Sequence, residues 1–232
     1  MATVSAQAAA AAVEERPTLP GGEGERFAGY GIMGLPFASG HVLAMRRFPA
    51  STIGPGYTSV WHRDPDGSWV FWQDQAPDLG CHRYFSASVA EARTVAIDLS
   101  WTGPSSLRVA VPEVGLAWSS TLRSSGATTV LNAVGSVLPE RLWRSPLVLS
   151  AMGRVAGPAL GAGRVGLAGV APNGQRFVAN PLRVWLVAEA TASLGGIDFG
   201  PIGPLDRQAS LGDFWIPQRG IFAIGRAAFT KA

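Results

Sequence analysis

Residues 58–73 read TSVWHRDPDGSWVFWQ and predict a β-hairpin. Both arms are rich in the β-branched and aromatic residues that favour strands. Between the arms, Pro65 presets the turn dihedral, and Gly67 supplies a positive φ that other residues adopt only at a cost. Successive side chains of a strand point to opposite faces, so the second arm, WVFWQ, is apolar on both of them. A sheet built from such strands must have both faces covered.

Strand patterns recur along the rest of the chain, and Asn173–Gly174 predicts the turn of a second hairpin. The further candidate strands are residues 27–33, 41–48, 94–101, 106–111, 114–122, 164–171, 175–188 and 219–229. About nine or ten strands at this spacing indicate an antiparallel meander. Closing the sheet on itself would cover its inner face and remove its edges. We therefore predict a mainly β fold: a single antiparallel β-barrel, lipocalin-like in architecture.

One helical segment is predicted at residues 138–162, packed on the outside of the barrel. Gly153, Gly157 and Gly161 fall four residues apart and share one helix face. Glycine inside a helix costs about 0.5–1 kcal/mol relative to alanine, so this spacing indicates a close neighbour. That neighbour is either the chain's own sheet or a second copy in a homodimer.

The first 25 residues are rich in alanine, then in proline, glycine and glutamate. They predict a disordered arm that could include a short helix at 5–15, ahead of one domain at 26–232. They lack the basic region and the apolar run of a secretory signal. No stretch reaches the roughly 18 uncharged apolar residues of a membrane span. By default we expect a cytoplasmic protein.

The composition excludes several chemistries. Hydrophobic residues make up 47% of the 232 residues and charged residues 15%, which indicates a large buried core. The single lysine, Lys231, lies next to the C-terminus and cannot be preorganised as a Schiff-base or P-loop lysine. The single cysteine, Cys81, excludes an intrachain disulfide and a thiolate zinc cluster. The net charge of +3 comes from scattered basic residues, which does not predict nucleic-acid binding. We expect no metal and no cofactor.

Eight tryptophans are present, and large aromatic side chains commonly line apolar ligand cavities. A barrel of this size can enclose one small ligand. We therefore predict that the lumen binds an apolar or amphipathic small molecule, such as a lipid, terpenoid or polyketide. The alternative is a filled core. The candidate ligand-binding residues are Tyr30, Tyr57, Trp61, Trp72, Trp101, Trp118, Trp185, Glu189 and Arg219.

Polar residues on otherwise apolar strands are candidates for catalysis. Asp98 facing the lumen would have a raised pKa that suits proton transfer; facing outward it would be an ordinary solvated carboxylate. His62 and His41 could act as its acid–base partners, or could be structural. These three residues define the alternative function, a cofactor-independent isomerase, hydratase or cyclase. A second alternative is a non-catalytic structural or dimerising protein.

Two further charged residues allow two interpretations each. Glu189 could be a buried acid, or it could pair with an arginine on the same strand face, such as Arg183. Arg219 could bind a carboxylate bidentately, or it could pair with Asp213. The sequence contains no motif that names a substrate or a reaction.

Overall fold

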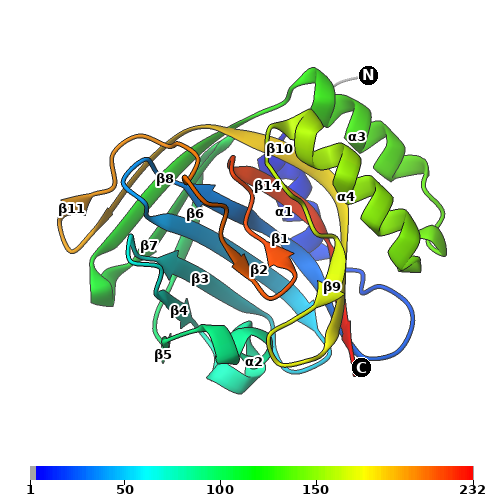
Figure 1. The fold of residues 1–232 in the computed structure, drawn as a ribbon, viewed down its shortest axis with the longest axis horizontal. Coiled ribbons are helices and arrows are strands. Elements are labelled where there is room, and N and C mark those ends of the chain that lie inside the picture. Colours follow the sequence, from blue (N-terminus) through cyan, green and yellow to red (C-terminus); the bar gives the residue numbers. More distant parts are fainter. Residues whose placement is uncertain (1–3, 232) are drawn as a thin grey trace.

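The computed structural model describes residues 4–231 and shows a mainly β fold around one strongly curled sheet (Figure 1). Ten strands follow one another in the order β5-β4-β3-β2-β1-β14-β10-β8-β7-β6. Their bounds are β1 Glu25–Pro36, β2 Val42–Ser51, β3 Tyr57–Arg63, β4 Trp69–Gln73, β5 Glu91–Thr94, β6 Asp98–Gly103, β7 Ser106–Val111, β8 Leu116–Arg123, β10 Arg176–Leu194 and β14 Ile221–Thr230.

Shorter elements surround this sheet. The short strands β9 (Ala168–Val170) and β11 (Ile197–Asp198) also pair with β10, while β12 (Ser210–Leu211) and β13 (Phe214–Trp215) pair with each other. The α-helices are α1 Ala6–Glu15, α2 His82–Phe85, α3 Gly126–Val137 and α4 Pro146–Leu160. Single 3₁₀ turns occupy Pro77–Leu79, Ser86–Ser88, Pro112–Val114 and Leu142–Arg144. In the described part of the chain, none of these helices is long and apolar enough to cross a membrane.

Both predicted hairpins are confirmed. β3 pairs with β4 across a turn in which Gly67 has φ +99°, and β9 pairs with β10 across a turn in which Gly174 has φ +88°. The predicted strand 94–101 is instead divided between two strands. β5 pairs with β4 in parallel, whereas β6 pairs with β7 in the antiparallel sense.

The sheet is open, which corrects the predicted closed, lipocalin-like barrel. In the described residues no ladder joins the two edge strands, β5 and β6, although only residues 95–97 separate them. Four Cα steps of chain span at most about 14 Å, so Thr94 and Asp98 bring the two edges close at one corner. Helices and loops cover the outer face over β1–β4, β10 and β14, whereas the outward residues of β8 are exposed. Closure is therefore not what buries the apolar side chains of the outer face.

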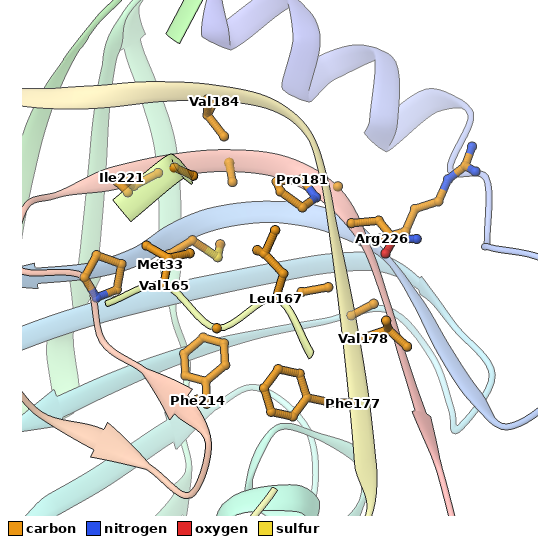
Figure 2. Close-up of a pocket in the computed structure, with 18 of the residues that line it drawn as sticks. Met33, Val165, Leu167, Phe177, Val178, Pro181, Val184, Phe214, Ile221 and Arg226 are labelled. Carbon is orange, nitrogen blue, oxygen red and sulfur yellow. The ribbon is translucent and has the colours of Figure 1, made fainter. Parts of the chain in front are cut away.

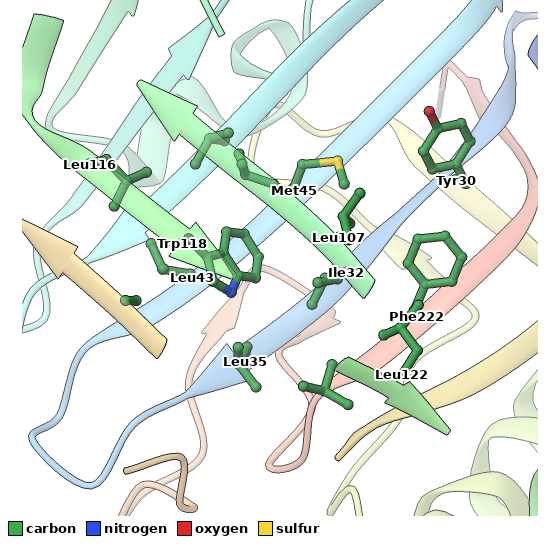
Figure 3. Close-up of a cluster of buried hydrophobic side chains, with 14 of the residues drawn as sticks. Tyr30, Ile32, Leu35, Leu43, Met45, Leu107, Leu116, Trp118, Leu122 and Phe222 are labelled. Atoms are coloured by element: carbon green, nitrogen blue, oxygen red, sulfur yellow. The ribbon is translucent and has the colours of Figure 1, made fainter. Parts of the chain in front are cut away.

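The concave side of the sheet is packed with its own side chains (Figure 3). The ring of Phe222 illustrates this packing: its centroid lies 5.9 Å from those of Tyr30 and Trp185 and 5.7 Å from that of Trp101. Other fully or nearly fully buried members are Ile32, Leu35, Leu43, Met45, Val60, Trp72, Leu107, Leu116, Trp118 and Leu122. The concave side is therefore a filled core. This was the alternative to the hollow lumen that we predicted there.

The predicted disordered arm contains the helix α1, which packs against this concave core. Ala6 and Ala10 are 0% and 1% exposed. Glu14 accepts hydrogen bonds from the Tyr30 hydroxyl at 2.8 Å and from Arg47 Nε at 2.9 Å. Burial alone would raise the pKa of Glu14, but these hydrogen bonds outweigh it and the pKa is lowered. An alanine-rich segment is therefore held in place by small buried side chains and one anchored carboxylate.

Two helices, α3 and α4, cover part of the convex face. We predicted one helix at 138–162, but the chain forms α4 from Pro146, which occupies the first helical turn. The helix α3 was not predicted; it begins with a reciprocal cap between Ser125 and Thr128. A Cβ on Gly153 would collide with the Val165 carbonyl. The glycine face thus packs on the chain's own returning segment, and the homodimer remains a prediction.

Candidate functional site

A cavity of about 490 Å³ lies on the convex face of the sheet, under α3 and α4. Its floor is formed by β1, β10 and β14, and its roof by α3, α4, the segment 165–167 and β13. Figure 2 shows Met33, Val184 and Ile221 on the floor strands, with Leu167 and Phe214 from the opposite side. Apolar side chains therefore form most of the wall.

Two glycines make room at the floor of this cavity. Gly29 of β1 and Gly225 of β14 are cross-strand partners, and both line the cavity. Each lies beside a register shift, where a Cβ would collide with a backbone carbonyl: that of Arg47 for Gly29 and that of Asn180 for Gly225. A larger residue at either position would be strained, so the floor carries no side chain there.

The roof is tied to the sheet by an amide. Asn132 of α3 donates to the Val184 carbonyl at 3.0 Å and accepts from the Val184 N–H at 2.7 Å. The side chain thus makes the two backbone hydrogen bonds that a neighbouring strand would make with Val184, where β10 has no strand on that edge. Val130 of α3 and Val155 of α4 line the cavity although they are 63% and 66% exposed. These two residues therefore lie at a mouth between the two helices.

Arg46 of β2 is buried at one end of the cavity. It is 5% exposed, and its guanidinium carbon lies 4.6 Å from the centroid of the Trp61 ring. Nη1 donates to the carbonyls of Ile32 at 2.6 Å and Met45 at 3.0 Å, and Nη2 donates to that of Met33 at 3.0 Å. The register of β1 and β2 shifts just after Ile32, so the guanidinium satisfies carbonyls at a bulge.

The groups around Arg46 do not neutralise its charge. Burial lowers its pKa to about 10, so the guanidinium stays protonated at neutral pH. Tyr57 and Cys81 also line the cavity, with Tyr57 Oη 3.4 Å from Cys81 Sγ. Burial raises the pKa of both groups, so both are neutral. Within residues 4–231, no carboxylate forms an ion pair with Arg46.

The predicted ligand-binding residues divide between the two faces of the sheet. Tyr57 and Trp61 line the cavity on the convex face, not the lumen. Trp72, Trp118 and Trp185 belong to the concave core, and Trp101 packs against it. Tyr30 borders the cavity, although its ring packs in the concave core.

Three polar atoms in the concave core have no hydrogen-bond partner among the described residues. They are the indole nitrogens of Trp72 and Trp118 and the hydroxyl of Ser120. Unpaired buried donors are costly and are commonly satisfied by ordered water. The packed concave core therefore includes three polar groups that the described residues leave without a hydrogen bond.

The predicted catalytic residues His41 and His62 are in contact. His41 Nδ1 lies 3.0 Å from His62 Nε2, and the rings stack on Phe199 and Trp72. His62 is 6% exposed, and burial lowers its pKa from 6.5 to about 4. Burial also lowers the pKa of His41. One neutral ring donates to the other, so protonation of the acceptor nitrogen would break the bond.

We expect stability to fall as the pH drops from 6.5 towards 4. The pKa of His62 is about 4 in the folded chain and about 6.5 when unfolded, so the unfolded state takes up the proton first. The loss should reach roughly 2–3 kcal/mol. Urea unfolding of the wild type and of His62→Gln across this window measures the loss, because the glutamine side chain does not titrate. Equal slopes for both proteins would contradict the assignment.

The remaining predicted residues lie away from the cavity. Asp98 is exposed, because it alternates with Leu99 and Trp101, which pack against the concave core. Glu189 is also exposed, although it was expected to share a face with buried Val187. The register of β10 shifts between these two residues, and a bulge of this kind exchanges the faces of the strand.

Arg219 and Asp213 have separate partners. Arg219 donates to the Leu160 carbonyl at 3.5 Å, at the end of α4. Asp213 accepts from the Val170 N–H at 2.9 Å. Across residues 4–231, no three His, Cys, Asp or Glu side chains are grouped so that they could hold a metal ion.

No protein-family model and no curated protein matches this chain. Among solved structures, it is similar to an acetoacetate decarboxylase from Legionella pneumophila subsp. pneumophila str. Philadelphia 1, with 12% sequence identity and a TM-score of 0.40. The alignment covers 92% of this chain and 87% of that chain. At this level of similarity we infer nothing about function from it.

Sequence reasoning missed Arg46 and the roof of the cavity. A signal for Arg46 was present: in the stretch 41–48, strand alternation places it on the face of Val42, Ala44 and Phe48. An arginine on an apolar face indicates either an exposed edge or a buried charge. The sequence of α3 gave no comparable signal, because its apolar and small residues do not form a clear helical stripe.

Proposed function

We propose that the protein binds an apolar or amphipathic small molecule in the cavity between the convex face of the sheet and the helices α3 and α4. The observation that carries this proposal is the cavity itself. Its volume of about 490 Å³ falls within the roughly 300–1,000 Å³ of small-molecule sites. Its wall is mainly apolar, with a few polar groups at one end.

Access to the cavity supports the same function. Val130 and Val155 are exposed apolar residues at the mouth, where they would contact a ligand on its way in. The neighbouring helices touch the sheet through few polar contacts, of which the Asn132–Val184 pair is one. A small outward movement of α4 would widen this entrance without breaking the sheet.

Filling the cavity should weaken binding. Ala156 of α4 lines the cavity, whereas Ala159 of the same helix is exposed. We expect the wild type and Ala159→Phe to bind the neutral probe N-phenylnaphthylamine with similar affinity. Ala156→Phe should bind it at least about tenfold more weakly, a cost of about 1.4 kcal/mol. Probe fluorescence in a titration measures all three proteins.

Two results would contradict this function. The first is a wild type that does not bind the probe, and the second is Ala156→Phe binding it as well as Ala159→Phe does. Native mass spectrometry of protein purified from its source adds an independent measurement, because a retained apolar molecule would appear as added mass and would be removed by mild organic extraction.

Acid–base catalysis is the second candidate function, and it rests on the His41–His62 pair. These two predicted residues meet at 3.0 Å beside the concave core, a distance at which a proton can pass from one ring to the other. The predicted third member, Asp98, is exposed and would not have a desolvated carboxylate. An isomerase or hydratase of the kind we predicted would therefore use the histidine pair alone.

A further inference from the structure

We propose that the molecule bound in this cavity is a monocarboxylic acid with an apolar body, and that Arg46 binds its carboxylate. The inference rests on the proposed function and specifies the chemical class of the ligand. It combines two features of the same site: an apolar cavity, and a buried guanidinium that lines it.

The guanidinium of Arg46 has more N–H groups than its backbone partners use. A guanidinium carries five N–H groups in a planar fork, and backbone carbonyls accept from it in three hydrogen bonds. Among residues 4–231, the other two N–H groups have no acceptor, so both are left for a ligand. This number matches the two oxygens of one carboxylate, which arginine binds bidentately in many proteins.

The positive charge of Arg46 is not explained by its structural contacts. Its three hydrogen bonds all go to uncharged backbone carbonyls, and a buried charge without a counter-ion is costly. The adjacent Arg47 shows the usual arrangement, since it forms an ion pair with Glu14 at 2.9 Å. The neighbours of Arg46 are instead Trp61, Phe214 and the neutral Tyr57 and Cys81. A ligand carboxylate would supply the missing negative charge.

The rest of the wall indicates the rest of the ligand. Phe177, Phe214, Leu167 and Val165 present apolar side chains to the cavity (Figure 2), so the body of the acid must be apolar. Arg226 also borders the cavity, but Figure 2 shows its guanidinium pointing away from these side chains. One available guanidinium suits a single negative charge and leaves the second charge of a phosphate monoester unpaired.

Calorimetric titration with dodecanoate and with dodecanol tests the proposal, because the two ligands differ only at the head group. We expect the wild type to bind dodecanoate at least about tenfold more tightly than dodecanol. In Arg46→Met this preference should disappear while dodecanol still binds. Arg47→Met, which removes the neighbouring charge on the opposite face, should keep the preference.

Each outcome decides a different point. Equal affinities in the wild type would overturn the role of Arg46 but leave the proposed function standing, whereas no binding of either ligand would overturn both. A preference that survives in Arg46→Met would assign the carboxylate to another group. If Arg46→Met does not fold, a carboxyl-¹³C label on dodecanoate bound to the wild type decides. Its pKa should lie below that of the free acid, and an unchanged or raised pKa refutes the contact.

Discussion

Replacing Ala10 by arginine is expected to lower the free energy of unfolding by at least about 3 kcal/mol. Ala10 is 1% exposed in the concave core, where a guanidinium would have neither water nor a counter-ion. The helix α1 would have to leave its place, and the ion pair of Glu14 with Arg47 would be lost with it. Urea unfolding followed by tryptophan fluorescence measures the change.

The matched control is the same substitution one residue further on. Ala11 is exposed on α1, so Ala11→Arg should change the stability by less than about 0.5 kcal/mol. Similar stabilities for the two variants would mean that α1 does not pack on the core. That result would return the N-terminal segment to the disordered arm expected from its composition.

Replacing Phe222 by alanine is expected to cost about 3–5 kcal/mol. Phe222 is 0% exposed and contacts three aromatic rings, those of Tyr30, Trp101 and Trp185. Its removal from a packed core leaves a void that these rings cannot fill without leaving their own contacts. Chemical denaturation of the wild type and the variant measures this loss in the free energy of unfolding.

The size of this loss also distinguishes a packed concave side from a hollow one. Phe222→Leu keeps most of the volume and should cost less than about 1.5 kcal/mol. A loss of only about 1 kcal/mol for Phe222→Ala would mean that the ring already faces open space. The lumen would then be a cavity after all, as the abundance of tryptophan suggested.

Local patterns determined most of the strands. Positive φ at Gly67 and Gly174 follows from turn chemistry that acts over four residues, so both hairpins could be predicted. Alternation also placed Asp98 opposite the apolar residues of its strand. Glu189 could not be placed in this way, because its orientation depends on a bulge in the pairing of β10 with β8, which is a property of two strands far apart in the sequence.

The sequence by itself determined that several strands are apolar on both faces, and hence that both faces of the sheet must be buried where those strands lie. It did not determine what buries each face, because the hydrophobic effect is non-directional. Helices near α1 and α4 were expected from local signals, but α3 was not. Tertiary structure decided that the concave side is filled and that the cavity lies on the convex side. It also brought Arg46 to that cavity and His41 to His62, since contacts between strands depend on register as well as on residue type.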